Sequence, residues 1–288
     1  MIETIAWRSG LGSALALSLA ACAPEAAPLG SGSVAAVAPA EPAQAPAPEP
    51  TPQPAPDIAG RWRIVSFDGR PPADTREEGK AAWLAFTRHG FGGMVGCNTF
   101  GGLGLLADGY YAVHSWSSTL VGCHDERGRQ ETALSKLMFA RPRVIAAGEG
   151  RLRLEAGGNF VELERTGPHP ERPYGSTPDL AGTRWRIVMM DGQEASPTPA
   201  GRFLQFGKGT WQGTASCATL SGTWRLEGDR IKVGEQIATT EQLCRADFAR
   251  IDESFAALMR SGPRYVVGPN GELLLAGGGH AMAGGRAD

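Results

Sequence analysis

The feature that most limits what this chain can fold into is an internal repeat. The segment DIAGRWRIVSFDG, residues 57–69, returns as DLAGTRWRIVMMDG, residues 179–192. The segment GMVGCNTFGG, residues 93–102, aligns without gaps with GTASCATLSG, residues 213–222. Because self-similarity of this kind means that one structural unit is encoded twice, the sequence predicts two homologous domains.

The repeat also places the domain boundaries. The first domain is expected at residues 57–165 and the second at residues 179–276. Residues 166–178, which contain several prolines and glycines, suit a linker between them. The glycine-rich end, residues 277–288, is expected to be disordered.

Each copy is predicted to be mostly β-strand. Trp62, Ile64 and Ser66 fall on one face of an alternating segment, as in a half-buried strand. Asp108-Gly109 is a strong hairpin signal, because both central residues of a type I′ turn need a positive φ. Short strands with frequent turns favour an antiparallel sheet that curls into a barrel and so removes its exposed edges.

One helix is also predicted in each copy. Apolar residues recur at helical spacing before a proline, which ends the run in both places. They are Leu134, Leu137 and Met138 before Pro142, and Ile251, Phe255, Leu258 and Met259 before Pro263. The expected fold class is therefore α+β and mainly β: two tandem, small, antiparallel barrel-like domains with one helix each.

The first 22 residues are typical of an export signal. Arg8 gives a short basic start, and an apolar run follows that is too short to span a membrane. The run ends at Leu19-Ala20-Ala21-Cys22, which resembles the lipobox of bacterial lipoproteins, so Cys22 is predicted to be the acylated mature N-terminus. The alternative is an ordinary signal peptide in which Cys22 has no role. Ala23 favours the outer membrane, facing the periplasm.

The segment that follows, residues 23–56, is rich in proline and alanine. It shows no apolar periodicity, so it is expected to be a disordered tether that holds the folded domains away from the bilayer. The net charge of −2 and the pI of about 6.2 leave no basic field for a nucleic acid partner. The membrane, reached through Cys22, is the predicted partner.

Four cysteines remain once Cys22 is assigned to lipid, and they permit three pairings. The repeat favours Cys97 with Cys123 and Cys217 with Cys244, because each domain then holds one bridge. The competing interpretation is a metal site that combines the first pair with His124, Asp125 and Glu126. It is disfavoured because the second copy has no histidine after its cysteine. No metal and no cofactor are predicted.

No catalytic residue is predicted either. Cys97 as a nucleophile would need a base such as His89, His114 or His124, and a disulfide would silence the thiol. A hydrolytic pair drawn from the acidic residues of the first helix is also possible in principle. These side chains, Asp125, Glu126 and Glu131, are expected to be solvated charges near a helix N-terminus.

Four tryptophans offer one further possibility. Trp83, Trp116, Trp211 and Trp224 are expected in the core, and the alternative is that they line a barrel cavity for a hydrophobic ligand. Asn98, beside Cys97, has Ala218 as its counterpart in the second copy. That difference suggests that the asparagine is dispensable to the fold.

These residues resemble the META domain of the HslJ-like group of bacterial envelope proteins. The resemblance covers both copies and rests on a tryptophan-containing first strand, a glycine-flanked cysteine, a threonine shortly before a second cysteine, and an L-x-L strand. The matching residues are Trp62, Gly96-Cys97-Asn98, Thr119, Cys123 and Leu152 to Leu154, then Trp185, Cys217, Thr240, Cys244 and Leu273 to Leu275.

The resemblance implies a lipocalin-like barrel, an envelope location, and an association with stress tolerance or antibiotic resistance, with no established catalytic residues. We therefore expect a non-enzymatic, lipid-anchored envelope protein with two tandem META domains. The alternative is a lipoprotein that binds a hydrophobic ligand or, as pilotins do, an envelope protein partner.

Overall fold

The structure, a computed structural model, describes residues 56–77, 80–168, 174–194, 201–240 and 244–287. The export signal, Cys22 and all of the predicted tether except Pro56 lie outside the described residues. Both repeats fall within one compact unit, Pro52–Asp288. Neither α1 nor α2, the two α-helices of the described residues, is both long and apolar enough to cross a membrane.

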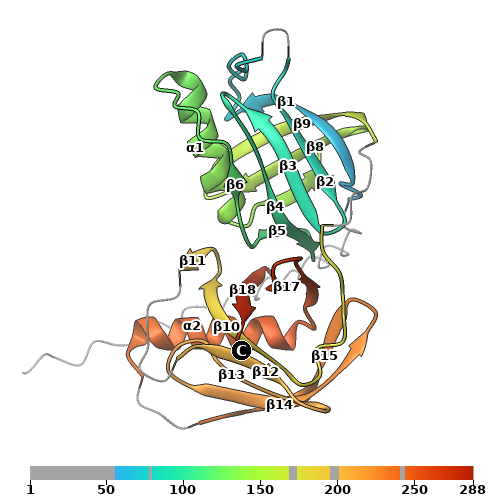
Figure 1. The fold of residues 1–288 in the computed structure, drawn as a ribbon, viewed down its shortest axis with the longest axis vertical. Coiled ribbons are helices and arrows are strands. Elements are labelled where there is room, and N and C mark those ends of the chain that lie inside the picture. The colour runs from blue at the N-terminus through green and yellow to red at the C-terminus, as the bar shows by residue number, and fades with distance from the viewer. Residues whose placement is uncertain (1–55, 78–79, 169–173, 195–200, 241–243, 288) are drawn as a thin grey trace, which may run out of the picture. The chain divides into compact units, whose positions relative to one another are not determined.

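The first repeat forms a closed antiparallel barrel with one helix (Figure 1). Its nine-stranded sheet runs β3-β2-β1-β9-β8-β7-β5-β4-β6, and pairing of β3 with β4 closes eight of the strands. The elements are β1 (Gly60–Phe67), β2 (Trp83–Thr87), β3 (Gly90–Val95), β4 (Asn98–Ala107), β5 (Tyr110–Val113), β6 (Ser117–Ser118), α1 (Glu126–Phe139), β7 (Arg143–Ala146), β8 (Arg151–Ala156) and β9 (Asn159–Gly167).

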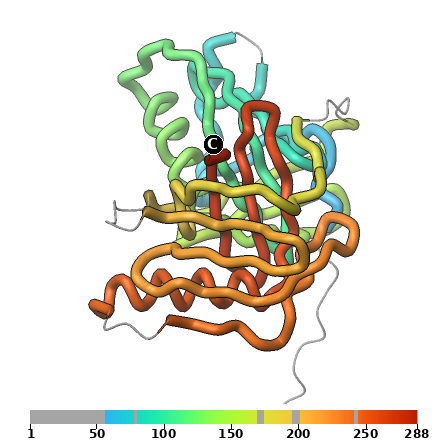
Figure 2. Tube along the Cα trace, turned by 60° about the horizontal axis from the view of Figure 1, so that its bottom comes forward, coloured from blue at the N-terminus to red at the C-terminus, as the bar shows by residue number. Residues whose placement is uncertain are grey.

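The second repeat builds the same barrel, drawn from yellow to red in Figure 2. Its order is β11-β10-β12-β13-β14-β15-β16-β17-β18, and pairing of β10 with β18 closes it. The elements are β10 (Thr183–Met190), β11 (Gln193–Glu194), β12 (Phe203–Phe206), β13 (Thr210–Thr214), β14 (Thr219–Glu227), β15 (Arg230–Thr239), α2 (Ala246–Arg260), β16 (Arg264–Val267), β17 (Glu272–Gly277) and β18 (His280–Arg286).

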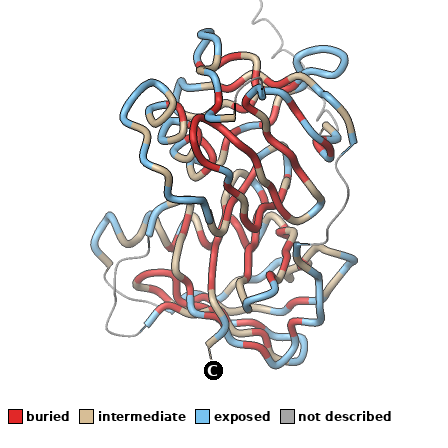
Figure 3. The backbone as a smooth tube through the Cα atoms, turned by 45° about the horizontal axis from the view of Figure 1, so that its top comes forward, coloured by how far each residue is buried: buried red, intermediate tan, exposed pale blue. Residues whose placement is uncertain are grey.

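The predicted periodicities are confirmed. In β1, Trp62 and Ile64 are buried while Arg63 is exposed, and β10 repeats this alternation in the second copy. Figure 3 shows that buried residues concentrate on the strands of both barrels. Asp108 and Gly109 have φ values of 50° and 81°, as a type I′ turn requires. The apolar faces predicted for the helices are buried against the barrels: Leu134, Leu137 and Met138 on α1, and Phe255, Leu258 and Met259 on α2.

The prediction of a disordered tail at residues 277–288 is wrong. Residues 280–286 form β18, which pairs with both β17 and β10 and so completes the second barrel. Small residues allow this close pairing, since a side chain on Gly284 would lie 2.9 Å from the Arg186 carbonyl oxygen. The L-x-L segments lie in β8 and β17, the penultimate strands of the two domains.

The segment predicted as a linker is partly ordered against the second barrel. Ser176 exchanges two backbone hydrogen bonds with Val267 of β16, at 2.9 and 2.8 Å. The Tyr265 hydroxyl donates to the Pro178 carbonyl at 2.7 Å, and burial raises the pKa of this phenol to about 12. Residues 169–173 lie outside the described residues.

Candidate functional site

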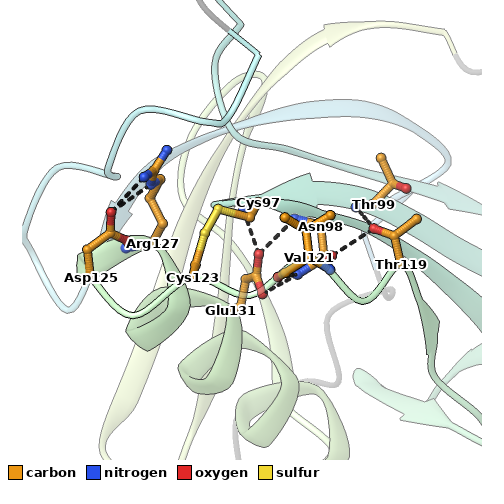
Figure 4. Close-up of a disulfide and its surroundings, with 9 residues drawn as sticks. All are labelled: Cys97, Asn98, Thr99, Thr119, Val121, Cys123, Asp125, Arg127 and Glu131. Carbon is orange, nitrogen blue, oxygen red and sulfur yellow. Dashed lines mark hydrogen bonds and ion pairs between the residues drawn. A yellow bond between two sulfur atoms is a disulfide. The ribbon is translucent and has the colours of Figure 1, made fainter.

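The cysteine motif of the first repeat is a crosslinked turn held by the helix (Figure 4). Cys97 is bonded to Cys123, with their Cα atoms 6.3 Å apart. The carboxylate of Glu131 on α1 reaches back to this turn, where its Oε1 accepts the backbone N–H groups of Cys97 at 2.6 Å and Asn98 at 2.7 Å. The expectation that Glu131 is a solvated charge is therefore wrong.

Asn98 connects the same turn to the segment that leads to Cys123. Its Nδ2 donates to the Val121 carbonyl at 3.0 Å and to Glu131 Oε2 at 2.9 Å. Its Oδ1 accepts from the Thr119 hydroxyl and from the Val121 N–H, both at 2.8 Å. Asn98 thus makes four hydrogen bonds and is only 7% exposed, which shows that it is a structural residue of the first copy rather than a dispensable one.

The second repeat builds the same turn with different groups. Cys217 is bonded to Cys244, with their Cα atoms 6.0 Å apart, as the repeat predicted. Asp252, the counterpart of Glu131, accepts the N–H groups of Cys217 at 3.1 Å and Ala218 at 2.9 Å through Oδ2. Its Oδ1 is buried without a partner among the described residues, and Ala218 has no side-chain amide that could donate to it as Asn98 donates to Glu131.

The threonine before each second cysteine has one role in both copies. The Thr99 N–H donates to Thr119 Oγ1, and the Thr119 N–H donates back to the Thr99 carbonyl. Thr219 and Thr240 repeat this pair of bonds. The motif therefore has a structural role: it positions the turn through the cysteine, the threonine and the helix carboxylate. The cysteines and threonines were recognised in the sequence, whereas the role of Glu131 and Asp252 was not.

Two of the three histidines weighed as bases, His89 and His114, contact backbone carbonyl oxygens of other segments. His89 Nδ1 lies 3.2 Å from the Gly175 carbonyl oxygen, and burial lowers the pKa of this imidazole. His114 Nε2 lies 2.8 Å from the Gly284 carbonyl oxygen. His124 lines a surface groove beside Cys123. Since both sulfur atoms of the first copy are in a disulfide, the geometry presents no thiol for these residues to activate.

Asp125 and Glu126, which the alternative metal site would use, make other contacts. Asp125 caps α1 and binds Arg127, whose side-chain hydrogen bonds lower the pKa of this exposed carboxyl. Glu126 pairs with Arg129 at 2.7 Å. In the described part of the chain, one group has metal-ligand spacing, namely Cys217, Cys244 and Asp252 within 4.8 Å. Its sulfurs are joined in the disulfide and its carboxylate accepts backbone N–H groups.

The four tryptophans do not line a common cavity. Trp211 and Trp224 are buried in the second barrel, where they pack against Phe255 and Phe206. Trp116 stacks on Phe100 with ring centroids 4.2 Å apart. Trp83 is half-buried under the Arg61 guanidinium, 3.9 Å from its ring centroid. Only Trp211 borders one of the cavities described below.

Two open cavities lie on different elements of the two barrels. A groove of about 750 Å³ runs beside α1, next to Cys123, with Ala133, Leu137, Ala140 and Ala156 as its apolar part and Arg129 and Lys136 among its polar residues. A cleft of about 880 Å³ lies on strands β12 to β15 of the second barrel. Amide and hydroxyl side chains line it, including Gln205, Thr210, Gln212, Ser221, Thr223 and Gln236.

One buried charge, that of Arg202, was not expected from the sequence. Arg202 is 7% exposed, and none of its three guanidinium nitrogens has a hydrogen-bond partner among the described residues. Burial lowers its pKa, and the nearby charge of Asp252 opposes this effect. The corresponding position of the first barrel is Ala82, whose carbonyl accepts the Ile64 N–H as that of Arg202 accepts the Ile187 N–H.

A family model described as META domain matches residues 56–167 and again residues 178–288. The chain belongs to the META domain family. The second match extends to residue 288, which agrees with the place of β18 in the barrel and not with a domain that ends at residue 276. A comparison with curated proteins gave no match.

Solved structures resemble this chain only distantly. One NMR structure is 17% identical, with a TM-score of 0.33, and covers 38% of this chain and 90% of its own. Another, from Burkholderia xenovorans, is 20% identical, with a TM-score of 0.32, and covers 42% and 97%. A DNA polymerase sliding clamp from Pseudomonas aeruginosa, solved with ligand, is 10% identical with a TM-score of 0.19 and covers 82% and 59%. Scores this low carry no argument about function.

Proposed function

We propose that this protein is a lipid-anchored, non-enzymatic component of the bacterial cell envelope that presents two META domains to the periplasm from the outer membrane. The observation that carries the proposal is Leu19-Ala20-Ala21-Cys22 at the end of an apolar run. The diacylglycerol and a further acyl chain at Cys22 would bury enough methylene groups, at about 0.8 kcal/mol each, to hold the chain stably on a bilayer. Residues 23–56 would then act as the spacer.

The described residues support a binding or structural role rather than catalysis. The motifs that looked reactive in the sequence hold turns in place: the cysteines are crosslinked, Glu131 and Asp252 accept backbone N–H groups, and the acids at the start of α1 pair with arginines. As in the HslJ-like group that the sequence resembles, stress tolerance and antibiotic resistance are the phenotypes in which we expect the protein to act.

Acylation is tested by expressing the full chain in a Gram-negative host fed an alkyne-bearing fatty acid. We expect label on the wild-type chain and recovery with outer-membrane fractions, and neither for Cys22→Ser. Cys97→Ser is the matched control, since it removes a cysteine that the structure places in a disulfide and leaves Cys22 intact. An unlabelled wild-type chain, or label that survives Cys22→Ser, would contradict the proposal.

A second candidate, binding of a hydrophobic molecule, is favoured by the groove beside α1. Its apolar part is made of small residues, Ala133, Ala140 and Ala156, and Leu137. Native mass spectrometry of the chain isolated from envelopes should then show bound lipid, which Ala133→Trp displaces by filling the groove. Lipid that is absent, or unchanged in Ala133→Trp, would exclude this groove as its site.

A further inference from the structure

The two META domains meet through the outer faces of their barrels, which share a third hydrophobic cluster. The first barrel contributes β4 and β5, and the second contributes β16, β17 and β18. All members are at most 6% exposed: Leu103, Leu105, Ala107 and Ala112 from the first barrel, and Val266, Leu274, Ala276, Ala281 and Ala283 from the second. The contact therefore joins two different faces of the same module.

Polar contacts fix the position of these two faces relative to each other. Asp108, at the β4–β5 turn, accepts from Arg230 at 2.9 Å and from the Gly278 N–H at 2.9 Å. Arg264 donates to the Leu106 carbonyl at 2.7 Å while its Nε binds Asp229 at 2.9 Å. These bonds favour one orientation of the two barrels, because shifting the register would leave partly buried charges without partners.

Each module also has a second face that takes no part in this contact, and most of the corresponding residues there are charged or polar. The exceptions are Phe160, at the position of Ala281, and Ile145, at the position of Val266. The hairpin alignment pairs Leu105, Ala107 and Ala112 of the first copy with Arg225, Glu227 and Lys232 of the second. The strand alignment pairs Leu274, Ala276 and Ala283 of the second copy with Arg153, Glu155 and Glu162 of the first. These charges pair within their own face, as Arg225 does with Glu227 and Arg153 with Glu155.

A contact between two different faces of one module can in principle repeat without end, because each added module exposes the next docking face. Arrays of such modules stay soluble only when polar end faces stop the addition. We propose that this chain is a head-to-tail pair of META domains, and that charged residues on its two remaining outer faces prevent a further META domain from docking there. The free β14–β15 face of the second domain and the free β8–β9 face of the first are latent docking surfaces for a further META domain.

Exchanging residues between the copies tests this. One variant gives the second domain the apolar face of the first: Thr223→Leu, Arg225→Leu, Glu227→Ala and Lys232→Ala. The other gives the first domain the apolar face of the second: Arg153→Leu, Glu155→Ala, Phe160→Ala and Glu162→Ala. Every sample carries the full chain with Cys22→Ala, which removes the proposed acylation site, and is measured by size-exclusion chromatography with light scattering.

We expect the wild-type chain and each variant alone to be monomeric. Mixing the two variants should give a 1:1 species of twice the mass of one chain, and combining all eight substitutions in one chain should give a ladder of longer species. Adding Leu274→Asp, which places a charge in the native contact, should not abolish the 1:1 species, because the new contact uses other faces.

Three outcomes would overturn the proposal. They are a wild-type chain that self-associates under the same conditions, a variant that dimerises alone, and a mixture that stays monomeric although both variants keep the wild-type near-ultraviolet circular dichroism and melt cooperatively. The second outcome would mean that exposing an apolar patch, rather than matching two faces, drives association.

Discussion

Asn98→Ala gives the first META domain the residue that the second has at the same position, Ala218. The substitution removes four hydrogen bonds and leaves Val121, Thr119 and one oxygen of Glu131 without their partners. With about 0.5 to 1.5 kcal/mol per bond, and some replacement by water at this partly buried site, we expect unfolding free energy to fall by about 3 kcal/mol.

The assay is thermal and urea unfolding followed by circular dichroism. For a cooperative unit of this size, about 3 kcal/mol corresponds to a fall in Tm of roughly 6 to 12 °C. The amide of Val121, which donates to Asn98 Oδ1, should also lose protection against hydrogen exchange, whereas the amides of Cys97 and Asn98 should keep theirs because Glu131 still accepts them.

Two controls make the reasoning refutable. Ala218→Asn introduces the amide into the second domain, where Asp252 Oδ1 has no partner among the described residues, so it should not destabilise. Asn98→Asp keeps an acceptor but sets a carboxylate against Glu131, so it should destabilise at least as much as Asn98→Ala. If Asn98→Ala cost less than about 1 kcal/mol, the four bonds would not contribute as partly buried hydrogen bonds do, and the network would be incidental to stability.

Further predictions concern the second domain and the contact between the domains. Replacing both Cys217 and Cys244 with serine should lower the unfolding free energy by about 3.5 kcal/mol, the chain-entropy value for a loop of 27 residues, as measured by urea unfolding under non-reducing conditions. Arg202→Met should leave the Tm unchanged or raise it, because the guanidinium is buried without hydrogen bonds; a fall of several degrees would show that it has partners in solution. Leu274→Asp should cost more than 3 kcal/mol by burying a charge and split the calorimetric transition into two, whereas the exposed Glu235→Asp should do neither. Acid should also weaken the contact, because ion pairs and hydrogen bonds, against the effect of burial, hold the pKa values of Asp108 and Asp229 below those of unfolded aspartate. Their stabilisation is present above about pH 4 and is lost as the pH falls through the folded-state values, so the two transitions should separate in wild-type calorimetry below pH 4.

The sequence predicted the fold well because the repeat supplied two versions of each signal. Several of these signals depend only on residues close together in the sequence, so they can be read without knowing the tertiary contacts. They are the alternation around Trp62, the Asp108-Gly109 turn and the helices before Pro142 and Pro263. The disulfide pairing followed from the same repetition. The last strand was missed because glycine and alanine carry no periodicity of hydrophobic size, although small residues are what a closing strand between two others requires.

The contacts of the candidate site depend on distant parts of the chain, which explains the errors there. Glu131 lies 34 residues from the N–H group of Cys97, and nothing in its helical neighbourhood distinguishes it from the solvated acids Asp125 and Glu126. The signal that was present is positional: an acidic residue, Asp252, recurs at the same place in the second copy. Arg202 was missed for a related reason, since it follows a polar segment in the sequence and one charge near it, Asp252, lies 50 residues further along the chain.

The differences between the copies carry more information than their similarities. Positions that match, such as Trp62 with Trp185 and Cys97 with Cys217, build the barrel and hold its turns. Other positions differ in a coordinated way, such as Leu105 with Arg225 and Leu274 with Arg153. They make one face of each domain apolar and the other face charged. In a single META domain the apolar face would be exposed to solvent, and an exposed apolar face favours association. The asymmetry therefore suits a chain that contains two domains. The duplication is therefore part of the fold, because the apolar face of each domain is covered by the other domain of the same chain.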